Sequence, residues 1–544
     1  MDPQINRLLE ILSKESSVIQ PKFDSAKKSI LLVSPSDYIS MIQNMGLQTL
    51  HYVLNKNQKV NVARSFISSK KEDNCIYSLD FQKDAQDYDL IGFSITNPLQ
   101  IKDFFKWMSK AKIPVERELR TERDPLIVAG GIGISNPLPF EKFIDVFFMG
   151  DAQKALMEFT DYYRNNNRKT LLNKFSNSRG IYIPEKTTKK YNPLIESDSL
   201  IKGSLNFKNQ EASLSLDRGC KFGCDFCQYF YNTGRKYLAF DLGELKEEVD
   251  KLQKLGANKL NIYSASSGNH PYFKEIMKYI QEKDIKIGLL DTRLEQLDDE
   301  TLKIFSSQGS LPLNLDAPSD RIRRIIKRSP IKDEAFLNKI KIANSEYSID
   351  KFSLYYIINY PGENVEDRSN IASFINKTLE ENILVDLVIF PLFPSPNTPL
   401  QRAQMQLPHI TKSRIEKIAE QIKIKGEERN KIDYDIAGEH ELFINKGRLN
   451  IRSIPLIHQL IEGLTLRGDR QSGQIVYDLW RENLLERDSL YPKAIRYLDE
   501  NHPKWKKYFD KIEEGSIPWA MVAPSNVQDY CEKRYLKLKR QLKA

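Results

Sequence analysis

The chain has 544 residues, of which 40% are hydrophobic and 10% aromatic, so two to four folded domains are expected and disorder is not. Its net charge of +9, from 82 basic and 73 acidic residues, permits an anionic partner without demanding one. No apolar run reaches the roughly 18 to 20 residues of a membrane span, and the polar amino-terminal residues lack a secretory signal pattern. We therefore expect a cytoplasmic protein without a membrane span.

The first 167 residues predict a helical arm and then a parallel α/β sheet. Residues 1–24 carry one short amphipathic helix. Residues 25–167 alternate short apolar strands with helical stretches, a pattern typical of a doubly wound, Rossmann-like domain that binds ligands at the carboxyl ends of its strands. The expected strands are residues 29–33, 60–63, 89–95, 126–129 and 144–149. A polar, poorly periodic stretch, residues 168–204, is predicted to be a connector.

The next segment places three of only five cysteines within eight residues. Cys220, Cys224 and Cys227 form a C-x3-C-x2-C triplet, and neighbouring glycines let such a loop turn its sulfurs inward. Thiolates hold iron-sulfur clusters, and three of them leave one iron of a four-iron cube open to a ligand. A structural zinc site would need a closed fourth ligand, whereas Cys75 and Cys531 are solitary and distant. A sparse, odd number of cysteines also disfavours a disulfide framework.

Six strands separated by helices predict a partial (βα)6 barrel over residues 205–409. The functional groups of such a barrel lie at the carboxyl ends of its strands. The expected strands are residues 212–216, 259–263, 287–290, 312–315, 352–358 and 385–390.

The cysteine triplet, with the aromatic Phe226 before its last member, resembles the cluster loop of the radical S-adenosylmethionine (radical SAM) superfamily. The resemblance implies a [4Fe-4S] cluster on the three cysteines and S-adenosylmethionine (SAM) chelated to the open iron by its amino and carboxylate groups. It also implies reductive cleavage to a 5'-deoxyadenosyl radical, with electrons from a donor such as flavodoxin or ferredoxin. Phe226 could pack on a flat aromatic cofactor.

Further resemblances to this superfamily follow the predicted barrel strands. Residues 264–268 stand where many members have a Gly-Gly-Glu segment that holds the methionyl amino group, but they contain no carboxylate and leave Ser264 and Ser266 as candidates. Arg293 could pair with the methionyl carboxylate or cap a helix. The other candidates for SAM contacts are Asp316 and Arg321 after strand four and Pro394 in the proline-rich turn after strand six.

The amino-terminal segments at residues 34–38, 124–131 and 150–151 resemble the cobalamin-binding-type domain that precedes many radical SAM modules, and more narrowly an uncharacterised family of such proteins. The D-x-H-x-x-G motif of a cobalt-ligating histidine is absent, and the nearest candidate, His51, lacks both the aspartate and the glycine. Cobalamin binding and a packing or docking role both remain open. The implied cofactor contacts are Ser34, Ser94, Gly130, Gly131 and Gly150.

Residues 410–544 are predicted to form a mostly helical carboxyl-terminal domain. Arg467 and Arg470 flank a Gly-Asp pair and could hold an anionic substrate group or join two helices through salt bridges. The tail from Lys533 to Ala544 carries six basic residues and no acid, so it could contact RNA or form a solvated helix face.

These features predict a radical SAM enzyme, with cobalamin-dependent methylation of an unactivated carbon as the leading hypothesis. One alternative is cobalamin-independent radical modification of RNA or a small molecule. Methylthiolation is disfavoured, because the usual methylthiotransferase needs three more cysteines and only Cys75 lies in the amino-terminal domain. The other alternative is a non-catalytic, cluster-bearing RNA-binding protein. Cleavage of SAM under reducing conditions would separate it from the enzymes.

Overall fold

In the computed structural model of the chain, the described residues are 2–543 without 68–75, 189–201, 289–292, 327–330, 424–443, 447, 514, 516 and 523–524. Cys75 and the second half of the predicted third barrel strand therefore lie outside the described residues. Among the helices that the structure describes, none is long and apolar enough to cross a membrane.

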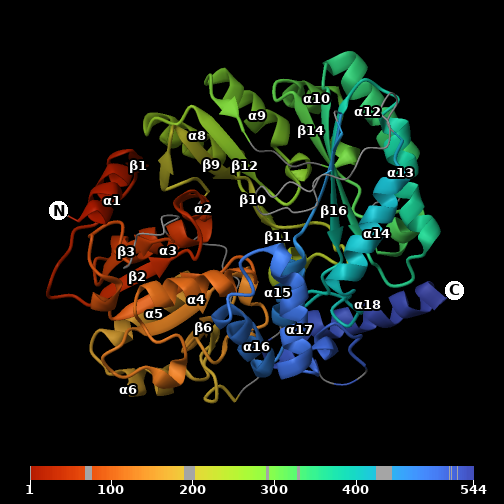
Figure 1. Cartoon of the computed structure of the whole chain (residues 1–544). Coiled ribbons are helices and arrows are strands. Elements are labelled where there is room, and N and C mark those ends of the chain that lie inside the picture. Colours follow the sequence, from red (N-terminus) through yellow and green to blue (C-terminus); the bar gives the residue numbers. More distant parts are fainter. Residues whose placement is uncertain are drawn as a thin grey trace.

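The amino-terminal region forms a six-stranded sheet in the order β3-β2-β4-β5-β6-β7, shown in red and orange in Figure 1. The first five strands are parallel, as predicted, and β7 is antiparallel to β6. Both β7 and the helix α6 lie in the stretch that was predicted to be a plain connector. The strands are β2 (Ser29–Val33), β3 (Asn61–Ser65), β4 (Leu90–Ser94), β5 (Leu126–Gly130), β6 (Val146–Phe148) and β7 (Ile181–Tyr182).

Alternating side chains of this sheet enter two different cores. Leu32 packs with one face and its helices α3 and α5, whereas Leu31 and Val33 belong to the opposite core. On that second face, Phe105 of α4 stacks edge to face with Tyr477 of a carboxyl-terminal helix, with 5.0 Å between the ring centroids. The helices of this region are α2 (Tyr38–Gln43), α3 (Met45–Asn57), α4 (Gln100–Lys110), α5 (Gln153–Tyr163) and α6 (Arg168–Phe175).

The central region, green to cyan in Figure 1, has two sheets that share one apolar core with their helices. In the first sheet β9, β12 and β13 are parallel, while β8 and the arm strand β1 add antiparallel neighbours. In the second, β14, β15 and β16 are parallel. Five of the six predicted barrel strands are therefore present, and the third, predicted at residues 287–290, overlaps β13 at Ile287. The strands are β1 (Glu15–Ser17), β8 (Asn206–Lys208), β9 (Glu211–Ser215), β12 (Lys259–Tyr263), β13 (Lys286–Ile287), β14 (Ser310–Asn314), β15 (Lys351–Ile358) and β16 (Leu384–Pro391).

The sequence did not predict the strand that continues the second sheet. β18 (Leu449–Ser453) pairs parallel with β16, and β17 (Ile444–Lys446) closes the edge antiparallel to β18. The barrel thus gains a parallel strand from the carboxyl-terminal region. The helices α8 (Leu242–Lys254), α9 (Phe273–Glu282), α10 (Asp299–Ser306), α12 (Asp333–Tyr347), α13 (Val365–Thr378) and α14 (Pro408–Glu420) contribute to the same core.

The rest of the carboxyl-terminal region is helical, as predicted, and lies between the two other regions in Figure 1. The helix α1 (Pro3–Ser13) forms the amino-terminal arm together with β1. The carboxyl-terminal helices are α15 (Leu456–Leu466), α16 (Arg470–Arg481), α17 (Tyr491–Asn501) and α18 (Ser525–Lys543).

Candidate active site

The cysteine loop is held at its base by a short antiparallel hairpin of β10 (Asp217–Gly219) and β11 (Tyr237–Ala239). Gly219 has a φ of +85°, and a Cβ there would come within 2.0 Å of the Lys236 carbonyl oxygen. Only glycine fits this approach. The loop ends in the short helix α7 (Gln228–Asn232), which begins directly after Cys227.

The three thiols share one poorly solvated environment. Burial raises the pKa of Cys220 and Cys227, and repulsion from the neighbouring Cys224 and Cys220 thiolates, respectively, raises them further. Thiolates in such a setting need a nearby cation, and iron supplies that charge. Among the described residues no three His, Cys, Asp or Glu side chains are grouped to hold a single metal ion. A cubane fits this spacing, because each cysteine binds a different iron.

The candidates after β12 and β13 lie beside the first cysteine. Ser264 donates a hydrogen bond from its hydroxyl to Oδ2 of Asp217 at 2.6 Å, and Ser266 donates to Gln296 at 3.2 Å. The Arg293 guanidinium lies 3.6 Å from the centroid of the Phe222 ring and pairs with Glu295 at 3.1 Å. Its charge acts to lower the pKa of Cys220. Arg293 is thus oriented towards the cluster loop.

Of the two candidates after β14, one lies beside the cysteine loop and the other does not. Asp316, in a left-handed conformation with φ of +59°, lies close enough to Cys227 for its charge to raise the pKa of that thiol. Arg321 instead pairs with Asp367 and donates to the Gly362 carbonyl oxygen at 2.8 Å, so it braces the neighbouring turn.

The aromatic ring before the last cysteine and the proline-rich turn both lie near the loop. Phe226 packs edge to face against Tyr360, with 6.3 Å between the centroids, in a small core with Leu392 and Leu400. Pro394 is buried in the turn after β16. The following Asn397 accepts a hydrogen bond on its carbonyl oxygen from the Cys531 thiol at 3.2 Å, which ties the turn to α18.

The Arg-Gly-Asp-Arg segment, residues 467–470, connects two helices through polar contacts, which was one of the two roles predicted for it. Arg467 is buried and donates from Nη1 to the Ala403 carbonyl oxygen at 2.6 Å. Asp469 caps α16 by accepting from the Ser472 amide at 3.0 Å, and Arg470 pairs with Glu141 at 2.7 Å. Arg467 thus joins the end of α15 to the segment after β16, and Arg470 joins α16 to the amino-terminal region.

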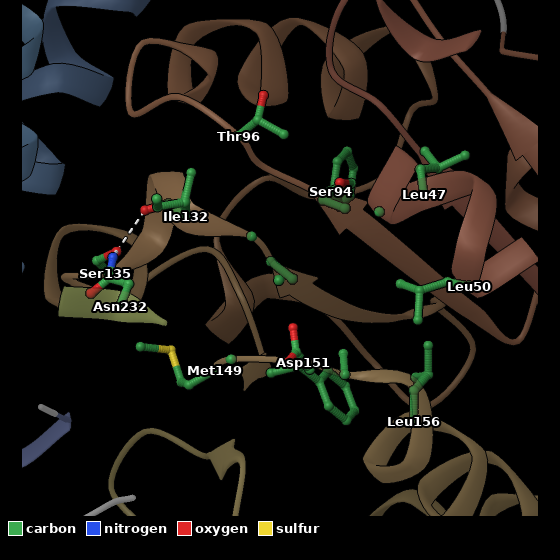
Figure 2. Close-up of a pocket in the computed structure, with 18 of the residues that line it drawn as sticks. Leu47, Leu50, Ser94, Thr96, Ile132, Ser135, Met149, Asp151, Leu156 and Asn232 are labelled. Atoms are coloured by element: carbon green, nitrogen blue, oxygen red, sulfur yellow. Dashed lines mark hydrogen bonds between the residues drawn. The ribbon is translucent and has the colours of Figure 1, made fainter. Parts of the chain in front are cut away.

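A cavity of about 360 Å³ opens at the carboxyl end of the amino-terminal sheet (Figure 2). Leu47 and Leu50 of α3 and Leu156 of α5 form an apolar side of it. Its polar lining residues include Ser94, Thr96, Ser135 and Asp151. Four of the five predicted cofactor contacts of this domain line it, namely Ser94, Gly130, Gly131 and Gly150.

The cavity reaches the cysteine loop. Arg218, two residues before Cys220, lines it and pairs with Asp151 at 2.7 Å. Asn232 at the end of α7 donates to the Ser135 hydroxyl at 2.8 Å. Arg218, Asp151 and Asn232 were not predicted as site residues, although Arg218 lies only two residues before the cysteine triplet.

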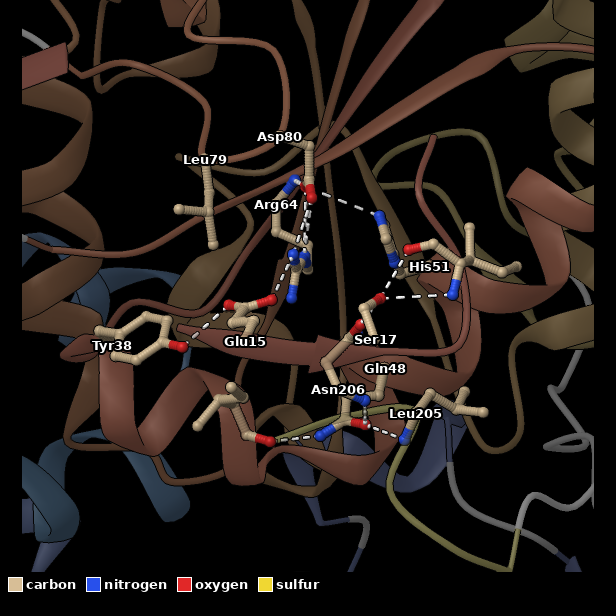
Figure 3. A network of polar contacts seen from close by, with 12 residues as sticks. Glu15, Ser17, Tyr38, Gln48, His51, Arg64, Leu79, Asp80, Leu205 and Asn206 are labelled. Carbon is tan, nitrogen blue, oxygen red and sulfur yellow. Dashed lines mark hydrogen bonds and ion pairs between the residues drawn. The ribbon is translucent and has the colours of Figure 1, made fainter. Parts of the chain in front are cut away.

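Ser34 and His51 do not line this cavity. Ser34 is buried at the end of β2 and shares a 2.7 Å hydrogen bond with Ser36. His51 faces a buried polar network (Figure 3), with Nε2 3.6 Å from Asp80, and burial lowers its pKa to about 4. Arg64 forms the centre of that network by pairing with Asp80 and with Glu15 of the arm. The network therefore joins the arm to the sheet.

Comparisons with protein families agree with this geometry. The model described as "Radical SAM proteins, N-terminal" matches residues 46–184, and the model of the radical SAM superfamily matches residues 214–375. Together the two matches cover more than half of the chain. The chain belongs to the radical SAM superfamily. Radical SAM enzymes use a [4Fe-4S] cluster and SAM, and the cysteine loop lies within the matched residues.

The chain is similar to several other proteins. The uncharacterised protein MJ0966 of Methanocaldococcus jannaschii is 24% identical over 410 residues, covering 73% of this chain and 84% of that protein. A tRNA-2-methylthio-N(6)-dimethylallyladenosine synthase of Ehrlichia ruminantium is 25% identical over 262 residues, covering 45% of this chain and 57% of the synthase. The structure of the radical SAM methyltransferase TsrM from Kitasatospora setae, with cobalamin and a [4Fe-4S] cluster bound, gives a TM-score of 0.48 at 14% identity over 71% of this chain and 75% of that chain.

Proposed function

We propose that this radical SAM enzyme binds cobalamin in the cavity of its amino-terminal sheet and methylates an unactivated carbon. The cavity carries the proposal, because it runs from the interior of the sheet to Arg218 and Asn232 on either side of the cysteine loop. A cofactor seated there would lie between the sheet and the cluster.

The shape and polarity of the cavity suit part of cobalamin. Ligand pockets commonly measure roughly 300–1,000 Å³, so a cavity of about 360 Å³ would hold the nucleotide tail and not the larger corrin ring. The leucine side chains of the lining would suit the flat aromatic base of that tail. The hydroxyls and the carboxylate of the lining would be hydrogen-bonding partners for the amide side chains of the ring.

The residues of this chain would have separate roles. Cobalamin, when bound, supplies a methyl carrier, and SAM with the cluster supplies the radical. Cys220, Cys224 and Cys227 would hold the cluster, while the Arg218–Asp151 pair would fix the distance between the two halves of the site. The cluster must be reduced, so we further propose a flavodoxin or ferredoxin as electron donor.

Reconstitution tests the proposal. The protein would be loaded anaerobically with iron, sulfide and hydroxocobalamin and desalted, and about four irons with one retained cobalamin are expected. Gly46→Leu should lose cobalamin and keep iron, because the residue lines the cavity and an ideal Cβ there meets only Asn44 Oδ1, at 3.4 Å. Gly46→Ala is the matched control and should keep both. If the parent protein retains about four irons but no cobalamin, the methylcobalamin mechanism is wrong.

Radical modification without cobalamin is the second candidate, since part of the chain resembles tRNA methylthiolation enzymes. The five cysteines of the chain cannot supply two sets of three cluster ligands, which argues against methylthiolation itself. Release of 5'-deoxyadenosine from SAM with dithionite is expected in either case. No release would instead favour a non-catalytic protein that contacts RNA through its basic tail.

A further inference from the structure

One buried carboxylate beside the cluster loop has no role in the functions described so far. Asp217 lies in β10, three residues before Cys220, and is only 4% exposed. Its Oδ2 accepts hydrogen bonds from the Ser264 hydroxyl at 2.6 Å and the Tyr237 hydroxyl at 3.3 Å. Its Oδ1 is buried and has no hydrogen-bond partner among the described residues.

A buried carboxylate oxygen without a hydrogen-bond donor destabilises the protein when no ligand is bound. A buried acceptor without a donor costs roughly 1–3 kcal/mol, and more when it is charged. Burial accordingly raises the pKa of Asp217 to about 6, although the hydrogen bonds from Ser264 and Tyr237, the charge of Lys221 and the backbone N–H of Ala265 oppose this shift. A ligand that donates an N–H group to Oδ1 would remove the cost.

The position of Asp217 indicates which ligand group this is. Asp217 is bonded to Ser264 after β12 and to Tyr237 of β11, and the Arg293 guanidinium lies 3.6 Å from the ring centroid of Phe222, two residues after Cys220. One negative and one positive side chain beside the cysteine loop are complementary to the amino acid portion of SAM. Residues 264–268, at the carboxyl end of β12, contain no carboxylate of their own, but Ser264 holds that of Asp217 in place.

We propose that Asp217, oriented by Ser264, accepts a hydrogen bond from the α-amino group of SAM. The carboxylate reaches the site from the strand that leads into the cysteine loop rather than from the segment after β12. This inference rests on the use of SAM by the enzyme and is independent of cobalamin.

Equilibrium binding to the cluster-loaded protein tests the assignment with three ligands. SAM and decarboxylated SAM carry the amino group, and 5'-methylthioadenosine lacks it. Asp217→Asn should weaken the binding of SAM and decarboxylated SAM about tenfold or more, because a charge-assisted hydrogen bond is lost. The affinity for 5'-methylthioadenosine should not change. Asp284→Asn is the matched surface control, since Asp284 is exposed and its left-handed conformation suits asparagine.

A second variant distinguishes the loss of one hydrogen bond from disruption of the cysteine loop. Ser264→Ala removes only the orienting hydrogen bond and should weaken SAM binding less than Asp217→Asn does, with four irons retained. Equal affinity of parent and variants for SAM, or an equal loss for all three ligands, would overturn the role of Asp217. A parent protein that binds no SAM would overturn the enzymatic assignment together with it.

Discussion

Arg534 of the last helix forms an ion pair with Asp225 inside the cysteine loop, with 2.6 Å between Nη2 and Oδ2. Nε adds bonds of 3.0 Å to both carboxylate oxygens, and Nη2 also donates to the Ile325 carbonyl oxygen at 2.6 Å. The side chains are 8% and 0% exposed. The residue between the second cysteine and Phe226 is therefore held from the opposite end of the chain.

Arg534→Ala should weaken cluster binding. Breaking a buried pair by removing one partner costs roughly 3–5 kcal/mol, because the remaining charge is left uncompensated. We expect fewer irons per chain after desalting and a lower Tm. Lys537→Ala in the same helix is the control, since Lys537 is exposed, and it should change neither value. Full iron occupancy in Arg534→Ala would show that α18 does not support the loop.

Replacement of single cysteines should separate the cluster ligands from the remaining described cysteine. Serine at position 220, 224 or 227 should abolish the cluster absorbance, since each thiolate binds one iron. Cys531→Ser should keep about four irons and SAM cleavage, because Cys531 is buried against Tyr231 and Val527 and its thiol donates to Asn397. Burial raises the pKa of Cys531 well above its usual value, so the thiol is a poor nucleophile. Loss of SAM cleavage in Cys531→Ser with full iron would instead assign this thiol a catalytic role.

Local patterns in the sequence predicted the strands of both regions and the cluster loop. Alternation in residues 29–33 and the spacing of three cysteines are signals carried by neighbouring residues. The pairing of β18 with β16 was not predictable, because Leu449 and Ile451 are its only buried apolar side chains and its partner lies some 60 residues earlier.

Contacts of single side chains with residues distant in sequence were not predictable either. Arg534 is one of six bases in a run, and only the fold turns it inward to a residue 309 positions away. The sequence offered Arg321 as a SAM contact, whereas the structure pairs it with Asp367, 46 residues further on. Charge and residue type indicate that a side chain can bind an anion but not which one it meets.

His51 should be dispensable for cobalamin binding. It points into the network of Asp80 and Arg64, and no histidine is among the described residues that line the cavity. His51→Gln should retain as much cobalamin as the parent protein. The EPR spectrum of bound cob(II)alamin should show no nitrogen coupling from a protein histidine in either protein. Loss of such a coupling on substitution would show that the histidine reaches cobalt.

The stability of the α15 region should fall as pH rises, because of Glu462. Burial alone raises the pKa of this carboxyl from its ordinary 4.5 to about 8. The folded state therefore holds a proton that the unfolded state releases, and stability is lost at up to about 1.4 kcal/mol per pH unit between pH 4.5 and 8. Glu462→Gln removes the titration, so its Tm advantage over the parent should grow from pH 5.5 to 8 and then level off.

Differential scanning calorimetry at pH 5.5, 7, 8 and 9 measures this difference directly. Glu420→Gln, at an exposed position of α14, is the control and should follow the parent at every pH. A Tm difference that is constant across the series would show that Glu462 does not titrate in this range. A difference that shrinks as pH rises would mean that the folded state favours the charged carboxylate, through a cation paired with Glu462.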